Sequence, residues 1–115
     1  MLPKANRLHQ DKDIKRLAQT GKTFFLPQLI IKYLNNQGDY TRFAFVVSTK
    51  VDKRAVVRNK LTRQLRELSK EFLPRIQTGT SVLIIAKKQA LDLDFDSLRK
   101  QLDFAFSKIR IYNKN

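Results

Sequence analysis

The chain lacks several residues on which common kinds of protein depend. Its 115 residues include no cysteine and no tryptophan, one histidine and only three glycines. Without cysteine, neither a disulfide framework nor a thiolate metal site is available, which suits a reducing compartment. A thiol nucleophile is excluded for the same reason. The glycines, Gly21, Gly38 and Gly79, lie too far apart to form a phosphate-binding loop.

Long apolar runs are absent as well. No run approaches the roughly 20 residues that a membrane-spanning helix needs, and residues 1–7 lack the apolar core of a signal peptide. We therefore expect a cytoplasmic protein with no membrane association. The length fits one domain over residues 1–115, with an extended segment at 1–10 and a tail at 110–115.

Acidic residues are scarce relative to basic ones. The chain has 24 Lys and Arg against 10 Asp and Glu, a formal net charge of +14. Such an excess repels itself in the compact state and attracts a polyanion, so a nucleic acid is the expected partner. A merely soluble basic protein is the alternative. Membrane-surface binding fits less well, because the apolar side of the basic helix described below is needed for the core.

Residues that could act as an acid, a base or a metal ligand are equally few. The single histidine, His9, stands in a polar N-terminal segment where a surface position is expected. Asp92, Asp94 and Asp96 resemble the start of a calcium loop, but that loop needs glycine at its sixth position, where Ser97 stands. Capping explains acidic residues before a helix. We therefore predict no catalytic residue and no metal or cofactor held by the protein.

The hydrophobic periodicity predicts the element order α-β-β-α-β-α. Helices are expected at 11–20, 54–73 and 95–109, and strands at 24–34, 41–48 and 80–87. Asp11 is expected to cap the first helix, and Gly21 to end it in a left-handed conformation. The first two strands, separated by turn-forming residues, are predicted to form an antiparallel hairpin. The fold class is then α+β, a single domain with one sheet covered by helices.

The segment 50–70 holds the most informative pattern. It carries eight basic residues against two acidic ones. On a helix, one side of this segment is an apolar stripe and an adjoining side is polar and mostly basic. The stripe consists of Val57, Leu61, Leu65, Leu68 and Phe72, and the basic side of Arg58, Asn59, Thr62, Arg63, Arg66 and Lys70. The stripe suits docking on a sheet, and the arginines suit phosphates, because guanidinium groups bind phosphate oxygens in pairs.

Residues 57–67, Val-Arg-Asn-Lys-Leu-Thr-Arg-Gln-Leu-Arg-Glu, resemble the signature helix of the bacterial ribonuclease P protein component. The segments 48–50, 81–87 and 109–114 are similar to that family as well. The resemblance implies a small mixed sheet with a left-handed β-α-β crossover (a ribosomal protein S5 domain 2-like fold), where general topology rules favour a right-handed one. It also implies an RNA-binding subunit. The residues implied to contact the catalytic RNA are Arg54, Arg58, Asn59, Lys60, Arg63 and Arg66.

The resemblance further implies that the catalytic RNA, with bound Mg²⁺, removes the 5′ leader of precursor tRNA. The protein would hold the leader between the sheet and the first helix, as a single copy with two RNA partners and no cofactor of its own. The implied leader-cleft residues are Ile14, Ala18, Lys32, Phe45, Ser48, Thr62 and Tyr112. A ribosomal or ribosome-assembly protein is the main alternative, followed by a stand-alone nuclease and a nonspecific nucleic-acid-coating protein.

Some positions depart from the family pattern. Ile14 and Ala18 stand where the family usually has phenylalanine, Lys32 where tyrosine is common, and Thr62 where lysine is expected. The adjacent Tyr33 is no easy substitute, because neighbouring strand residues point to opposite faces. Base–aromatic stacking contributes about 1–3 kcal/mol per base. We therefore expect weaker discrimination between precursor and mature tRNA than in a relative with both phenylalanines.

Overall fold

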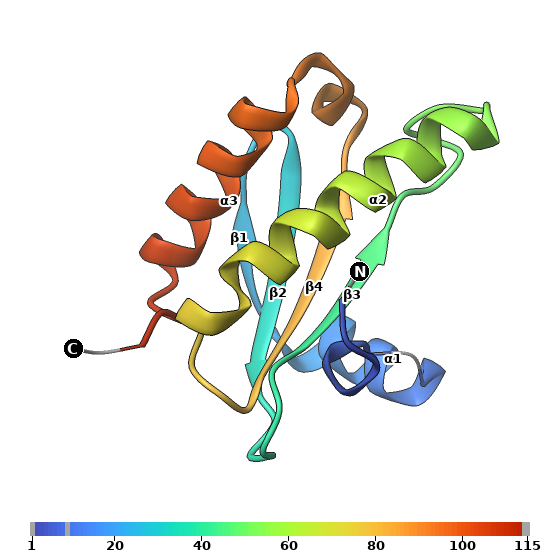
Figure 1. Ribbon diagram of the computed structural model, residues 1–115. Coiled ribbons are helices and arrows are strands. Elements are labelled where there is room, and N and C mark those ends of the chain that lie inside the picture. Colours follow the sequence, from blue (N-terminus) through green and yellow to red (C-terminus); the bar gives the residue numbers. More distant parts are fainter. Residues whose placement is uncertain (1, 9, 114–115) are drawn as a thin grey trace.

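The computed structural model describes residues 2–8 and 10–113, so His9 and the last two residues of the tail lie outside it. Three α-helices and a four-stranded sheet make up an α+β domain (Figure 1). The helices are α1 (Asp11–Thr20), α2 (Ala55–Phe72) and α3 (Phe95–Lys108). The strands are β1 (Lys22–Phe25), β2 (Leu29–Asn35), β3 (Arg42–Val46) and β4 (Thr80–Ala86). Short 3₁₀ helices are η1 (Lys4–Asn6), η2 (Leu73–Arg75) and η3 (Lys88–Asp92). The three predicted helices and the last strand are confirmed to within one residue at each end.

The sheet has the order β1-β2-β4-β3. The hairpin predicted between the strands at 24–34 and 41–48 is therefore wrong. β4 lies between β2 and β3, antiparallel to β2 and parallel to β3; Ile84 is opposite Ile31 on one side and Phe45 on the other. The strand predicted at 24–34 is in fact two strands, joined by a turn in which the Leu26 amide donates to the Leu29 carbonyl at 2.8 Å. β4 takes a central position because both of its sides are apolar and buried.

The connection from β3 through α2 to β4 is a left-handed crossover. In Figure 1 both strands run upward, α2 passes in front of the sheet, and β4 lies to the left of β3. A right-handed connection viewed in this way would move to the right. The handedness implied by the family resemblance is therefore present, against the general preference for right-handed units.

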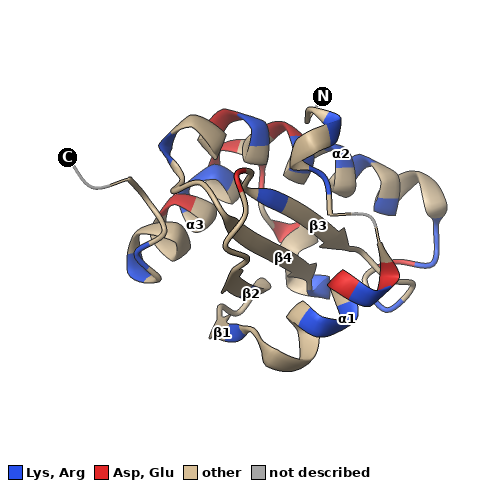
Figure 2. Cartoon of the chain, turned by 90° about the horizontal axis from the view of Figure 1, so that it is seen from below, with Lys and Arg blue, Asp and Glu red and all other residues tan. Residues whose placement is uncertain are grey.

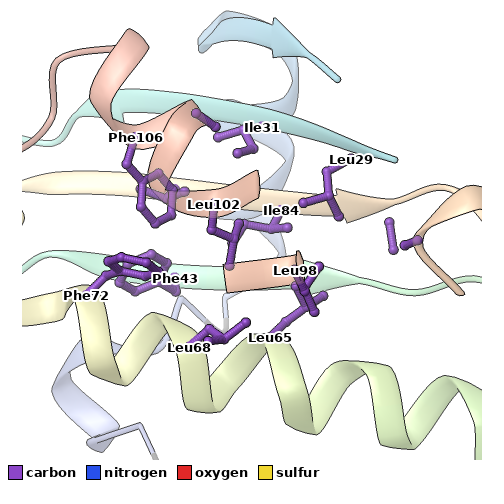
Figure 3. Close-up of a cluster of buried hydrophobic side chains, with 14 of the residues drawn as sticks. Leu29, Ile31, Phe43, Leu65, Leu68, Phe72, Ile84, Leu98, Leu102 and Phe106 are labelled. Atoms are coloured by element: carbon purple, nitrogen blue, oxygen red, sulfur yellow. The ribbon is translucent and has the colours of Figure 1, made fainter. Parts of the chain in front are cut away.

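The sheet has helices on both sides. α2 and α3 cover one side, and the shorter α1 lies against the other (Figure 2). The main core forms between the sheet and the pair α2 and α3, where Phe43, Phe72 and Phe106 meet (Figure 3). Phe72 and Phe106 contact edge to face, with ring centroids 5.5 Å apart. α2 is thereby fixed to the sheet by its apolar stripe, of which Leu61, Leu65, Leu68 and Phe72 are buried.

Both ends of α1 differ from the prediction. Gln10, not Asp11, precedes the first helical residue, and its side chain makes no capping hydrogen bond. Gly21 has φ −68°, which is not left-handed. Its lack of a side chain is needed for another reason: a Cβ atom there would lie 2.6 Å from the Leu17 carbonyl oxygen and 3.1 Å from that of Tyr33. Gly21 therefore permits a close approach between α1 and β2.

The N-terminal segment is more ordered than the extended chain predicted for residues 1–10. Within it, η1 precedes a parallel bridge between Arg7 and Phe43, and the Leu8 amide donates to the Phe43 carbonyl at 2.7 Å. Leu2 is 1% exposed and belongs to the main core. This segment therefore covers the outer edge of β3, which would otherwise be open to pairing with another chain.

Candidate nucleic-acid interface

The polar side of α2 faces away from the sheet. We define the outer face of α2 as Asn59, Lys60, Arg63, Arg66 and Lys70, all exposed. None of the five makes an ion pair or side-chain hydrogen bond with another residue that the structure describes. Glu67 is the only acidic residue of the chain between Lys53 and Lys70. The outer face therefore presents four cations on a rigid helix, an arrangement suited to phosphate groups.

Arg54 is on the list of predicted RNA contacts, but it forms an ion pair within the preceding loop. Its Nε and Nη2 atoms donate to the two carboxylate oxygens of Asp52 at 3.1 and 3.0 Å. Its backbone amide also donates to Asp52, at 2.8 Å. The Arg54 side-chain hydrogen bonds, helped by that amide, lower the pKa of Asp52 from 3.8 to about 2. Arg54 therefore carries a paired charge at the start of α2.

Arg58 has a local role as well. It is half-buried, and its Nη1 atom donates to the carbonyl oxygens of Asp52 and Lys53 at 3.0 and 2.8 Å. Thr62, one turn further on, donates to the Arg58 carbonyl at 2.9 Å. Arg58 thus fixes the loop before α2 to the helix. The six predicted RNA contacts therefore fall into two groups. Arg54 and Arg58 bond to the loop before α2. The other four are exposed and make no ion pair or side-chain hydrogen bond with a described residue: Asn59, Lys60, Arg63 and Arg66.

Three of the predicted leader-cleft residues lie where α1 meets the sheet: Ile14, Ala18 and Lys32. We define the α1 face as a set of strand side chains on the side where α1 packs: Phe25, Ile30, Lys32, Leu34, Ala44, Val46, Leu83 and Ile85. Ile14 and Ala18 of α1 pack beside it. The Lys32 ammonium group bridges the two elements, donating to the Ala18 carbonyl at 2.9 Å and to Thr23 Oγ1 at 3.3 Å.

The other four predicted cleft residues do not lie beside these three in the structure. Phe45 lies on the opposite side of the sheet, stacked on Phe43 with ring centroids 6.3 Å apart. Tyr112 also packs there, against Phe72 and Phe106. Ser48 is exposed in the loop after β3, and Thr62 belongs to α2. Phe45 follows Ala44, which is on the α1 face, and successive strand residues point to opposite sides of the sheet.

Tyr112 is held by its own network. Its hydroxyl donates to Asp103 at 2.5 Å, and the Arg75 guanidinium lies 4.4 Å from its ring centroid. Burial, reinforced by the bond to Asp103, raises the pKa of Tyr112 above its usual value. The residue closes the C-terminal end of the core, where it bridges to Ile76.

Sequence reasoning missed an exposed apolar part of the α1 side. Phe25 is 69% exposed and Val46 37% exposed. Phe25 is opposite Ile30, beyond the part of the sheet that α1 covers. The adjacent pair Phe24 and Phe25 carried the signal, because two neighbouring strand residues cannot both face the main core. Phe25 therefore adds an aromatic ring to a face where α1 supplies none.

Other kinds of site find little support in the described part of the chain. Among residues 2–8 and 10–113, no three His, Cys, Asp or Glu side chains gather in a group that could hold a metal ion. None of the described helices has the length and apolar character needed to cross a membrane. The exposed cations on α2 and the partly covered α1 face are thus the surfaces to compare with known proteins.

Comparison with known proteins identifies the family of the chain. The family model described as Ribonuclease P matches residues 2–110. The ribonuclease P protein component of Synechocystis sp. is 36% identical over 111 residues, covering 96% of this chain and 90% of the relative. That of Dictyoglomus turgidum is 31% identical, covering 97% and 95%.

Solved structures show the same fold. The ribonuclease P protein of Staphylococcus aureus superimposes with a TM-score of 0.86 at 27% identity, covering 96% of this chain and all of that one. That of Thermotoga maritima gives 0.80 at 26% identity, covering 89% and 96%. The family match decides between the ribonuclease P and ribosomal alternatives. The chain belongs to the ribonuclease P family, as a protein subunit of that enzyme.

Proposed function

We propose that the chain binds the catalytic RNA of ribonuclease P through the outer face of α2, and the 5′ leader of precursor tRNA on the α1 face of the sheet. The observation that carries the first part is the row of exposed cations on a helix whose opposite side is fixed by Leu61, Leu65 and Leu68. Because the helix is already ordered, little conformational entropy is lost when the row docks on phosphates.

Hydrolysis is assigned to the RNA. The described residues offer no metal-binding cluster, so the Mg²⁺ ions of the reaction are proposed to be held by RNA oxygens. The protein contributes positive charge, which lowers the repulsion between two polyanions that must approach each other. The relatives are bacterial proteins, and we place this activity in the cytoplasm, where tRNA is processed.

Leader binding is supported by the shape and chemistry of the α1 face. The apolar side chains of Ile14 and Phe25 lie on this side of the sheet, and Lys32 supplies a cation beside Ala18. Unpaired bases bind such surfaces by stacking and apolar contact, while a nearby cation attracts the backbone. Phe25 provides an aromatic surface that the first helix lacks.

Reconstitution tests the RNA-binding part. The protein is mixed with a bacterial ribonuclease P RNA at low Mg²⁺, and both the affinity of assembly and removal of the 5′ leader are measured. The double variant Arg63→Gln/Arg66→Gln is expected to weaken assembly at least about tenfold, because two charge-assisted bonds are lost. Arg54→Gln is the matched control, since Arg54 is already paired with Asp52. Equal affinities for the double variant and the wild type would refute this use of α2.

The leader-binding part has a separate test. In the variant Ile14→Phe/Ala18→Phe, the ratio of affinities for precursor and mature tRNA should rise, since each base stacked on a new ring adds about 1–3 kcal/mol. Phe25→Ala should lower the same ratio. Assembly with the catalytic RNA serves as the internal control and should change in neither variant. Unaltered ratios in both variants would remove the α1 face from leader binding.

A further inference from the structure

We propose that a pocket between α1 and the turn joining β2 to β3 binds an unpaired guanine of RNA. The pocket has a volume of about 420 Å³, within the range of about 300–1,000 Å³ that is usual for ligand sites. Leu8, Leu17 and Leu34 supply its apolar part, and residues 35–40 form one wall. It is therefore large enough, and polar enough at its rim, for a nucleobase.

The pocket adjoins the leader surface proposed above and shares Leu34 with it, but its α1 residues are different. Asp13 and Arg16 of α1 line it. On a helix these two positions lie on one side of Leu17, whereas Ile14 and Ala18 lie on the other. Leu17 itself is 1% exposed and separates the two surfaces. An RNA base in the pocket would thus contact Asp13 and Arg16, which a leader beside Ile14 and Ala18 would not use.

The charges that line the pocket cancel. Two guanidinium groups, on Arg16 and Arg42, are matched by two carboxylates, on Asp13 and Asp39. Among residues 2–8 and 10–113, none of these four side chains has an ion pair or hydrogen bond of its own. A phosphate would bring negative charge to a site that already contains two carboxylates. A neutral ring with both donors and acceptors at its edge fits better.

Guanine has the required edge. Its O6 and N7 atoms accept hydrogen bonds from arginine, the commonest base-specific contact of that side chain. Its N1–H and N2–H₂ groups donate and would be satisfied by a carboxylate. Adenine presents an amino donor where guanine presents O6, so it would place that donor against an arginine. Unpaired bases of RNA are commonly read through these edges.

The turn that forms one wall is already ordered. Asn36 donates to Ser81 Oγ at 2.9 Å and to the Tyr40 carbonyl at 3.3 Å, while its own side-chain oxygen accepts from the Gly38 amide at 2.7 Å. The Asn36 backbone amide donates to the Gly79 carbonyl at 2.7 Å. A wall held in this way loses little entropy when a ligand binds. Tyr40, 52% exposed, lies at the rim where a base could stack.

Titration with nucleosides tests the pocket by itself. Guanosine, adenosine and inosine carry no phosphate, so the net charge of +14 does not attract them. Amide resonances of residues 13–17 and 35–40 should shift with guanosine, with an affinity at least about tenfold higher than for adenosine. Inosine, which lacks the N2 amino group, should fall between them. Arg42→Gln should abolish the preference. Lys12→Gln, on α1 but outside the pocket, should leave it intact. Equal shifts with all three nucleosides, or none at these residues, would overturn the proposal.

The source of the guanine is tested in the holoenzyme, and this step alone rests on the proposed function. Dimethyl sulfate methylates guanine at N7, the atom that an arginine would cover. A guanine that is protected with the wild-type protein and reactive with Arg16→Gln/Arg42→Gln identifies the source as the catalytic RNA or the precursor tRNA. If no guanine changes in either RNA while assembly remains intact, the inference fails and the proposed function stands.

Discussion

Single residues on α2 show that a basic side chain in a signature motif is not automatically a contact with RNA. Arg54 and Arg58 lie in the same stretch as Arg63 and Arg66, yet they bond to the loop that precedes the helix. The motif thus combines two tasks, anchoring of a loop and presentation of cations. The residue types alone suggested contacts with RNA, and only the bonds of Arg54 and Arg58 to residues 52–53 separate the two tasks.

The Asp52–Arg54 pair predicts a specific dependence of stability on pH. The pKa of Asp52 falls from 3.8 to about 2 on folding, so its carboxylate stabilises the folded state above pH 3.8. That contribution is lost as the pH falls from 3.8 toward 2, where the group becomes protonated in both states. The free-energy difference between the wild type and Asp52→Asn, measured by urea unfolding, should therefore be constant at neutral pH and shrink over this interval. A difference that does not vary down to pH 2 would contradict the assignment.

The elements of the fold were largely readable from the sequence, but their arrangement was not. Periodicity located α2 and α3 because each has a long apolar stripe, and it located β4 because its run is apolar throughout. The periodicity predicted one strand where the structure has β1 and β2, because the residues on both sides of Pro27 are strand-forming. It also paired β2 with β3, because neighbours in sequence usually pair, whereas β4 occupies the place between them.

The candidate site was predictable to a similar degree. The exposed cations of α2 followed from helical spacing, and the positions of Ile14 and Ala18 from the family resemblance. Phe45 and Tyr112 lie on the α2 and α3 side of the sheet, because a family resemblance does not record the side on which a residue packs. The pocket beside the β2–β3 turn brings together residues from three separate segments, so no local pattern could reveal it.

The N-terminal segment predicts an effect on stability that its polar composition would not suggest. Leu2 is buried in the main core and holds η1 against the edge of β3. Leu2→Ala should lower the free energy of unfolding by about 2–5 kcal/mol, the usual effect of truncating a buried leucine. Leu91→Ala, at a position 37% exposed, is the control and should change it far less. Similar losses in the two variants, measured by denaturant unfolding, would mean that the segment contributes nothing to the core.

At the scale of the whole molecule, Lys and Arg residues are spread over several elements of the chain, α1, α2 and α3 among them (Figure 2). From the sequence, five or six neutralised phosphates would give a slope of about −4 to −5 for log K against log salt. Within residues 2–8 and 10–113, four cations on the outer face of α2 have no ion pair or side-chain hydrogen bond: Lys60, Arg63, Arg66 and Lys70. The effective number is therefore smaller than the number of basic residues in the motif.

With four cations, the slope of log K against log salt is expected to be about −3 to −4 for binding to the catalytic RNA through α2. Arg63→Gln/Arg66→Gln should make the slope less steep by about 2, because each lost phosphate contact removes about one unit. Filter binding over a range of KCl concentrations measures both values. A slope that is as steep in the double variant as in the wild type would show that other cations carry the interaction.

The place of β4 between β2 and β3 also affects the order in which the protein can be built. A ribosome releases β1, β2 and β3 well before β4, and β2 and β3 have no edge in common. Until residue 86 has emerged, the nascent chain can form only the hairpin of β1 and β2. The strand that pairs with β3 begins some 34 residues after the end of β3. Synthesis of nearly three-quarters of the polypeptide must therefore precede the closing of its sheet.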